Sequence, residues 1–148
     1  MNYGYTTASD ATRAALRASL RDRAEQFQIW LFEGQLRNVL AVVERLPKAL
    51  ADLLPIIANP EANLNVRFGA SAVLERYAGA PALQALVPAL GMLAGHGDAR
   101  VRADACHLLG LSGSQDAVKY LEARRDDPDA EVREIVAESL EELQTKEE

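Results

Sequence analysis

The chain has 148 residues, about half of them apolar, and a formal net charge of −6, which describes a single globular domain with a real core. The acidic excess lies after residue 58, with −7 there against +1 before, and argues against a general nucleic-acid binder, which carries a basic stripe. No apolar stretch approaches the roughly 20 residues that span a bilayer, and no secretory signal opens the chain, so we expect a cytoplasmic protein without membrane insertion.

The N-terminal part predicts an irregular tail and one helix. Residues 1–8 show no period, whereas Ser9 or Asp10 can cap a helix that runs to about residue 32 with apolar residues at helical spacing. This helix carries a row of arginines four apart, followed by one more: Arg13, Arg17, Arg21 and Arg23. The row fits a solvated helix face, a contact strip for an acidic partner or, as a third class of function, a nucleic-acid contact.

Gly34 is expected to break this helix, and a second helix follows over residues 35–45. Pro47 closes it, because the residue before a proline is pushed out of helical geometry. Trp30 and Phe32 stand just before the break. Trp30 is a candidate interface residue, with core packing under the next helices as the alternative. Residues 1–46 are thus expected to form a tail and a helical cap.

The remainder of the chain repeats itself. An apolar segment at 49–57 returns at 82–90 with a proline at the same place, Pro55 and Pro88, and returns more weakly at 116–123 without one. Each copy leads into a helix with the dipeptide Val-Arg, at Val66-Arg67, Val101-Arg102 and Val132-Arg133. A period of about 33 residues made of helix, turn and helix predicts a solenoid, because one helix pair cannot bury its apolar face alone. Residues 47–148 are expected to form three such pairs, packed with the cap as one domain.

Two structural roles are predicted for the repeated residues. The residue three before each Val can cap its helix, and these residues are Asn63, Asp98 and Asp129. Each arginine of the dipeptide is expected to lay its stem along the neighbouring helix and reach an acid of the next unit.

The segment Leu-x-x-Leu-Val-Pro-x-Leu followed by Asp-x-x-Val-Arg-x-x-Ala-x-x-Leu-Leu-Gly resembles the HEAT repeat, and its shortness resembles the HEAT-like class of phycobilisome lyases. The resemblance covers roughly residues 48–144; it departs at Asn63, which replaces an acid, and at the third leading helix, which lacks the proline. It implies an all-α, right-handed α-solenoid. It also implies a non-catalytic scaffold, adaptor or assembly factor, or alternatively an accessory factor of the lyase or cofactor-insertion type.

Catalytic and metal-binding patterns are missing from the sequence. Cys106 and His107 are adjacent, so on a helix their side chains point about 100° apart and cannot form a nucleophile–base couple directly. Ser71 and Ala137 occupy the positions equivalent to Cys106, and all three are small, which favours a packing role. Two histidines without clustered acids make a poor metal site. We therefore expect no enzyme activity, no metal and no cofactor; the lyase-type alternative requires Cys106 or His107 to line an open groove.

A partner surface is predicted on the Val-Arg helices, because the resemblance places them on the concave side of the solenoid. The non-core positions there are Asn65, Phe68, Arg100, Ala103, His107, Glu131, Glu134 and Glu138. They run from an apolar and cationic end to an acidic one, which fits either a solvated end cap or a groove for a protein partner with a basic surface, anchored near Phe68. The sequence leaves the oligomeric state open.

Overall fold

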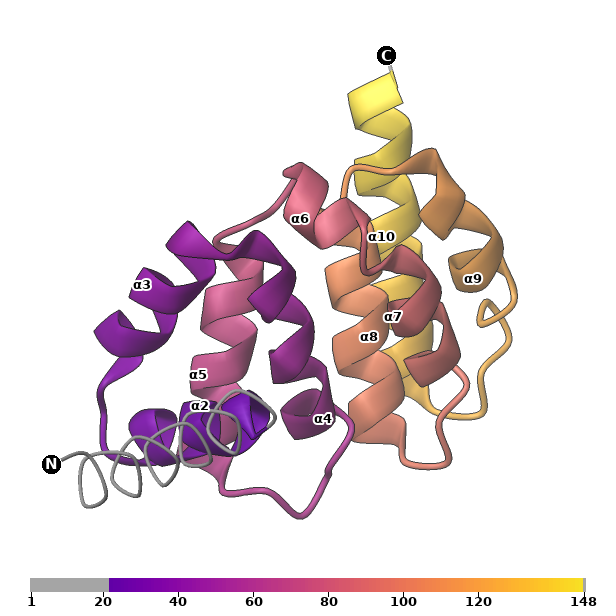
Figure 1. The fold of residues 1–148 in the computed structure, drawn as a ribbon. Helices are drawn as coiled ribbons and strands as arrows, with labels where there is room; N and C mark the ends of the chain where they lie inside the picture. The colour runs from indigo at the N-terminus through magenta and orange to yellow at the C-terminus, as the bar shows by residue number, and fades with distance from the viewer. Residues whose placement is uncertain (1–21, 148) are drawn as a thin grey trace, which may run out of the picture.

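The computed structural model describes residues 22–147, and all regular elements in that range are helical (Figure 1). In chain order they are α2 (Arg23–Phe32), α3 (Leu36–Arg45), η1 (Pro47–Leu53), α4 (Leu54–Ile57), α5 (Leu64–Glu75), α6 (Pro81–Gln84), α7 (Val87–Leu93), α8 (Ala99–Leu111), η2 (Gln115–Ala117), α9 (Val118–Glu122) and α10 (Ala130–Glu147). The tail and the arginines at 13, 17 and 21 lie outside the described residues, as does the start of the expected first helix.

The three Val-Arg helices α5, α8 and α10 lie side by side, with α8 between the other two (Figure 1). Each is preceded by a leading segment, and the all-α solenoid of helix pairs expected from the sequence is confirmed. The leading segments are not single helices: the first is divided into η1 and α4, the second into α6 and α7, and the third into η2 and α9. Pro55 and Pro88 stand in the first turns of α4 and α7, where a proline's missing amide costs no hydrogen bond.

The break at Gly34 has the geometry that the sequence predicts. Gly34 has a φ of 75°, its amide donates to the Leu31 carbonyl oxygen at 3.2 Å, and the Gln35 amide donates to the Trp30 carbonyl oxygen at 2.7 Å. These two bonds are a Schellman ending, which needs a left-handed residue and so favours glycine. α3 then ends before Leu46, which has an extended φ of −135° ahead of Pro47.

The three predicted caps are confirmed. Asn63 accepts hydrogen bonds from the amides of Asn65 and Val66 at 2.9 and 3.3 Å. Asp98 accepts from the Arg100 amide at 2.8 Å, and Asp129 accepts from the Val132 amide at 3.1 Å. Each side chain satisfies an amide that the first helical turn leaves without an intrahelical partner.

The helices of successive repeats approach closely, and glycine allows one of these contacts. A Cβ on Gly110 would lie 2.6 Å from the Cβ of Ser139 and 3.0 Å from its Cα, so α8 and α10 could not approach this closely with any larger residue. Ala103, which the helical wheel placed at the surface, is buried. It lies seven residues before Gly110 and therefore on the flank of α8 that α10 covers.

Two of the three Val-Arg arginines bridge to the next repeat, as predicted. Arg67 forms an ion pair with Asp104 on α8, and Arg102 donates to both carboxylate oxygens of Asp127 at 2.9 and 3.0 Å. Each arginine also donates to a carbonyl oxygen in the turn before its own helix: Arg67 to Asn59 at 2.8 Å, Arg102 to His96 at 3.0 Å and Arg133 to Asp127 at 2.7 Å. Arg133 reaches no acid, because no further unit follows in the described part of the chain.

Asp127 is the buried acid at the centre of the last junction. Burial opposes its ionisation, but the hydrogen bonds from Arg102 and from the Asp129 amide outweigh burial, so its pKa lies below the ordinary value. Arg124 Nε lies 3.2 Å from the same carboxylate. The ionised form of Asp127 therefore links the second repeat to the third.

Candidate functional site

The exposed row along α5, α8 and α10 is the surface that the sequence predicted for a partner, and we call it the Val-Arg strip. Its members are Leu64, Asn65, Phe68, Arg100, His107, Glu131, Glu134 and Glu138. Phe68 and Leu64 are each 62% exposed and stand four residues apart, so they share one face of α5. Sequence reasoning missed Leu64, although its spacing from Phe68 is a signal that could have found it.

The two basic members of the strip already have acidic partners. Arg100 lies 3.2 Å from Asp98 and 4.0 Å from Glu61, and its side-chain hydrogen bond lowers the pKa of Asp98. His107 Nε2 lies 3.3 Å from a carboxylate oxygen of Glu75. The expected cationic section is therefore balanced by carboxylates, an arrangement that the helical wheel of one repeat could not show because Glu61 and Glu75 come from the repeat before.

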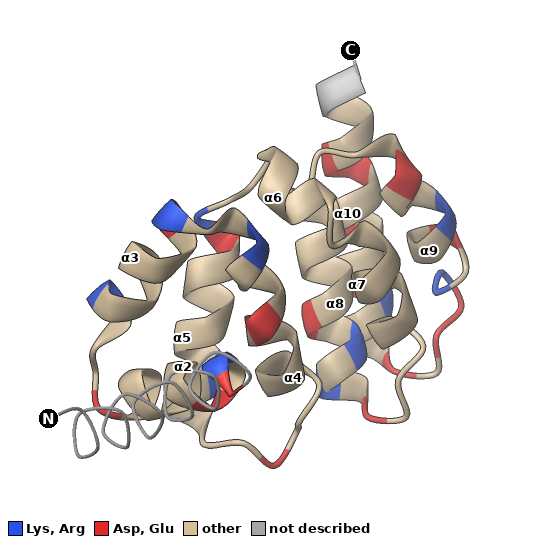
Figure 2. Cartoon of the chain, viewed as in Figure 1, with Lys and Arg blue, Asp and Glu red and all other residues tan. Residues whose placement is uncertain are grey.

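The acidic section lies on α10. Glu131, Glu134 and Glu138 are exposed, and none of them forms a hydrogen bond or ion pair through its side chain with another described residue. Figure 2 shows acidic residues toward the C-terminal end of α10. The net field at this end of the strip is negative and favours basic groups.

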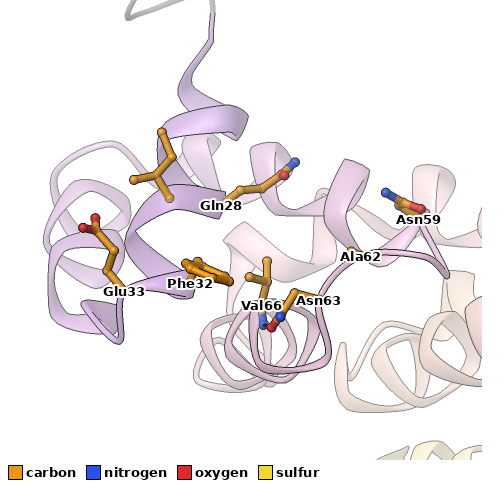
Figure 3. A pocket seen from close by; sticks show the side chains of 8 residues that line it. Gln28, Phe32, Glu33, Asn59, Ala62, Asn63 and Val66 are labelled. Atoms are coloured by element: carbon orange, nitrogen blue, oxygen red, sulfur yellow. Dashed lines mark hydrogen bonds between the residues drawn. The ribbon is translucent and has the colours of Figure 1, made fainter.

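Trp30 and Phe32, the two aromatic residues before the first helix break, lie in different environments, one against the core and one at the surface. Trp30 is half-buried against the core, with its ring centroid 6.3 Å from that of Phe27. Phe32 is 67% exposed and lines a hollow of about 500 Å³ together with Ile29 and Val66. Figure 3 shows Phe32 and Val66 next to each other in this view, with Glu33 on one side and Asn59 on the other. Its walls combine apolar side chains with the polar side chains of Gln28, Glu33, Asn59 and Asn63.

Cys106 does not line an open groove. It is fully buried, and burial raises the pKa of its thiol to about 11, so almost no reactive thiolate is present near neutral pH. His107 is exposed but points to Glu75. The requirement of the lyase-type alternative is therefore not met by Cys106, and the small side chain serves the packing of α8 against α10.

Within residues 22–147, no group of three or more His, Cys, Asp or Glu side chains is placed to hold a metal ion. No described helix is long and apolar enough to cross a membrane. The large apolar side chains exposed in the described part of the chain are Ile29, Phe32, Leu64, Phe68 and Met92.

The stacked helix pairs place this chain in the class of helical-repeat proteins. The family model for HEAT repeats matches residues 50–141, so this chain belongs to the HEAT-repeat family. Proteins of this family are typically non-catalytic and are commonly protein-interaction scaffolds. Neither the curated proteins nor the solved structures contain a match to the chain.

Proposed function

We propose that this protein is a non-catalytic cytoplasmic scaffold, an adaptor or assembly factor, that binds a protein partner along the Val-Arg strip. The exposure of Leu64 and Phe68 on one face of α5 is the observation that carries the proposal. Two adjacent large apolar side chains that are exposed to water contribute little to the stability of the monomer. Such patches are typical of protein interfaces. Membership of the HEAT-repeat family supports the same function.

The chemistry of the strip specifies the partner. Leu64 and Phe68 favour an apolar anchor, whereas Glu131, Glu134 and Glu138 favour lysine or arginine. Neighbouring helices pack about 10 Å apart, so α5 and α10 are separated by about 20 Å, or roughly six residues of extended chain. The partner is therefore a protein surface or segment with an apolar side chain at one end and a basic cluster at the other.

The anchor is tested in two steps. The partner is first captured with a variant that carries a photo-crosslinking residue at position 68, and the affinity of the captured partner is then measured for substituted variants. Phe68→Ser should weaken binding of the captured partner by about tenfold or more, as is usual for an aromatic hot spot. Met92→Ser is the matched control, because Met92 is also a large exposed apolar residue but lies on α7, outside the strip. Equal affinities of the two variants would refute the anchor.

The acidic section is tested by charge reversal. The variant E134K/E138K should lower the affinity for the partner and flatten its dependence on salt, because the attraction to basic groups is replaced by repulsion. Glu44→Lys reverses an exposed charge on α3, outside both the strip and the hollow beside Phe32, and serves as the control. An affinity and a salt slope that do not change in E134K/E138K would contradict the proposed role of α10.

A further inference from the structure

One flank of each Val-Arg helix carries a repeated pattern, which we call the stacking edge. It consists of the arginine, a small residue and a leucine, separated by four and three positions. These residues are Arg67, Ser71 and Leu74 on α5, and Arg102, Cys106 and Leu109 on α8. The edge of α8 faces α10, whose Ser139 hydroxyl donates to the Cys106 carbonyl oxygen at 3.1 Å.

The last described helix repeats this pattern with Arg133, Ala137 and Leu140, but the pattern is left partly exposed in the described chain. Leu109 and Cys106 are fully buried on α8, whereas the equivalent Leu140 is only half-buried and Ala137 is exposed. Arg133 is exposed and donates to the Asp127 carbonyl oxygen, but it pairs with no carboxylate of the described chain. The end face of α10 thus keeps the residues that elsewhere receive another helix.

We propose that two copies of the chain associate through this edge, with their α10 helices packed antiparallel about Ala137. Arg133, Ala137 and Glu141 are exposed and follow one another at intervals of four residues, so they lie on one flank of α10. In an antiparallel pair centred on Ala137, each Arg133 faces Glu141 of the partner subunit. The flank is therefore self-complementary in charge, which is the property that a two-fold symmetric interface requires.

The geometry favours pairing between chains over pairing within one. Arg133 and Glu141 are eight residues apart, which is about 12 Å along the helix, so they cannot form an ion pair in the same chain. Ala137 at the axis permits close approach, and Leu140 loses its remaining exposure. Glu134 lies about 60° and Glu138 about 100° from Ala137 around the helix, and at about 0.15 M salt the Debye length of about 8 Å limits the repulsion between these acids.

The test is sedimentation equilibrium of the full chain between about 5 and about 500 μM, a range that covers the weak affinities of small interfaces. We expect a concentration-dependent dimer. Arg133→Glu or Glu141→Arg alone places like charges against each other at two symmetric contacts and should weaken dimerisation by about tenfold or more. The double variant R133E/E141R should restore it, because each pair is exchanged but preserved.

The controls separate this interface from a change in the fold. Arg133→Glu loses the bond to the Asp127 carbonyl oxygen in both the single and the double variant, so recovery in the double variant can only come from the contact between chains. Ala137→Glu should abolish the dimer, whereas Ala41→Glu, an exposed alanine within α3, should not alter it. The proposal is overturned if the wild-type protein is a monomer over the whole concentration range, or if the double variant is as monomeric as the single variants. The stacking edge would then be a contact surface for a different helix.

Discussion

The junction between the second and third repeats depends on one buried carboxylate, and Asp127→Asn tests it with almost no change in volume. Asp127 accepts two charge-assisted hydrogen bonds from Arg102 and one from the Asp129 amide. An asparagine keeps one acceptor oxygen but leaves the guanidinium, whose side chain is 11% exposed, without a counter-charge. Losing one partner of a buried pair costs about 3–5 kcal/mol, and the carbonyl bonds of Arg102 at His96 and Gly97 reduce this, so we expect a loss of about 2–4 kcal/mol.

Urea unfolding followed by circular dichroism measures this loss. The midpoint should fall while the slope against urea stays constant, because the surface exposed on unfolding does not change. Glu122→Gln is the matched control: Glu122 pairs with Arg125 on the exposed surface, and such a pair contributes little. If Asp127→Asn costs no more than Glu122→Gln, the carboxylate does not hold the repeats together and the reasoning is refuted.

The pH dependence of the same difference has a definite sign. Because the pKa of Asp127 is lower in the folded protein than in the unfolded chain, its contribution is complete above the unfolded value of about 3.9. It is lost as the pH falls through the folded pKa. The difference in unfolding free energy between wild type and Asp127→Asn should therefore be constant at neutral pH and shrink at acidic pH, whereas a difference that grows on acidification would contradict this assignment.

Three further outcomes are expected. Cys106 should react with a thiol reagent only after unfolding, because it is fully buried and its pKa is about 11; rapid labelling of the folded protein would contradict this. Gly110→Ala should destabilise the protein by about 1–3 kcal/mol in a thermal melt, since the new methyl group overlaps Ser139, whereas Gly97→Ala meets no atom within 4 Å and should cost less. Asn63→Ala should cost about 1 kcal/mol through loss of the cap, and an unchanged melting temperature would count against that role.

The helix caps, the first helix break and the stacking of helix pairs could be predicted from the sequence. Caps at Asn63, Asp98 and Asp129 depend only on the first turn of the helix that each precedes, so residue type and spacing suffice to predict them. The break at Gly34 is equally local. The recurrence of Val-Arg was enough to predict stacked helix pairs, because a single pair cannot bury its own apolar face.

The candidate site required the tertiary structure. The members of the Val-Arg strip other than Leu64 were named from a helical wheel, but a wheel shows one helix and no neighbours. Ala103 is buried because α10 covers its flank, and the charge of Arg100 is paired with the carboxylates of Glu61 and Asp98.

The sequence by itself determined the helical pairs, their caps and their order, since hydrogen bonding within a turn and the period of apolar residues are set by neighbours in the chain. The tertiary structure decided which acid each arginine reaches: Arg67 pairs with Asp104 on the next helix, whereas Arg102 pairs with Asp127 in the next turn. It also left Leu64 and Phe68 in solvent and the end face of α10 uncovered. The physical reason is that burial and ion pairing depend on distances between residues of different repeats, which only the packing of the repeats sets.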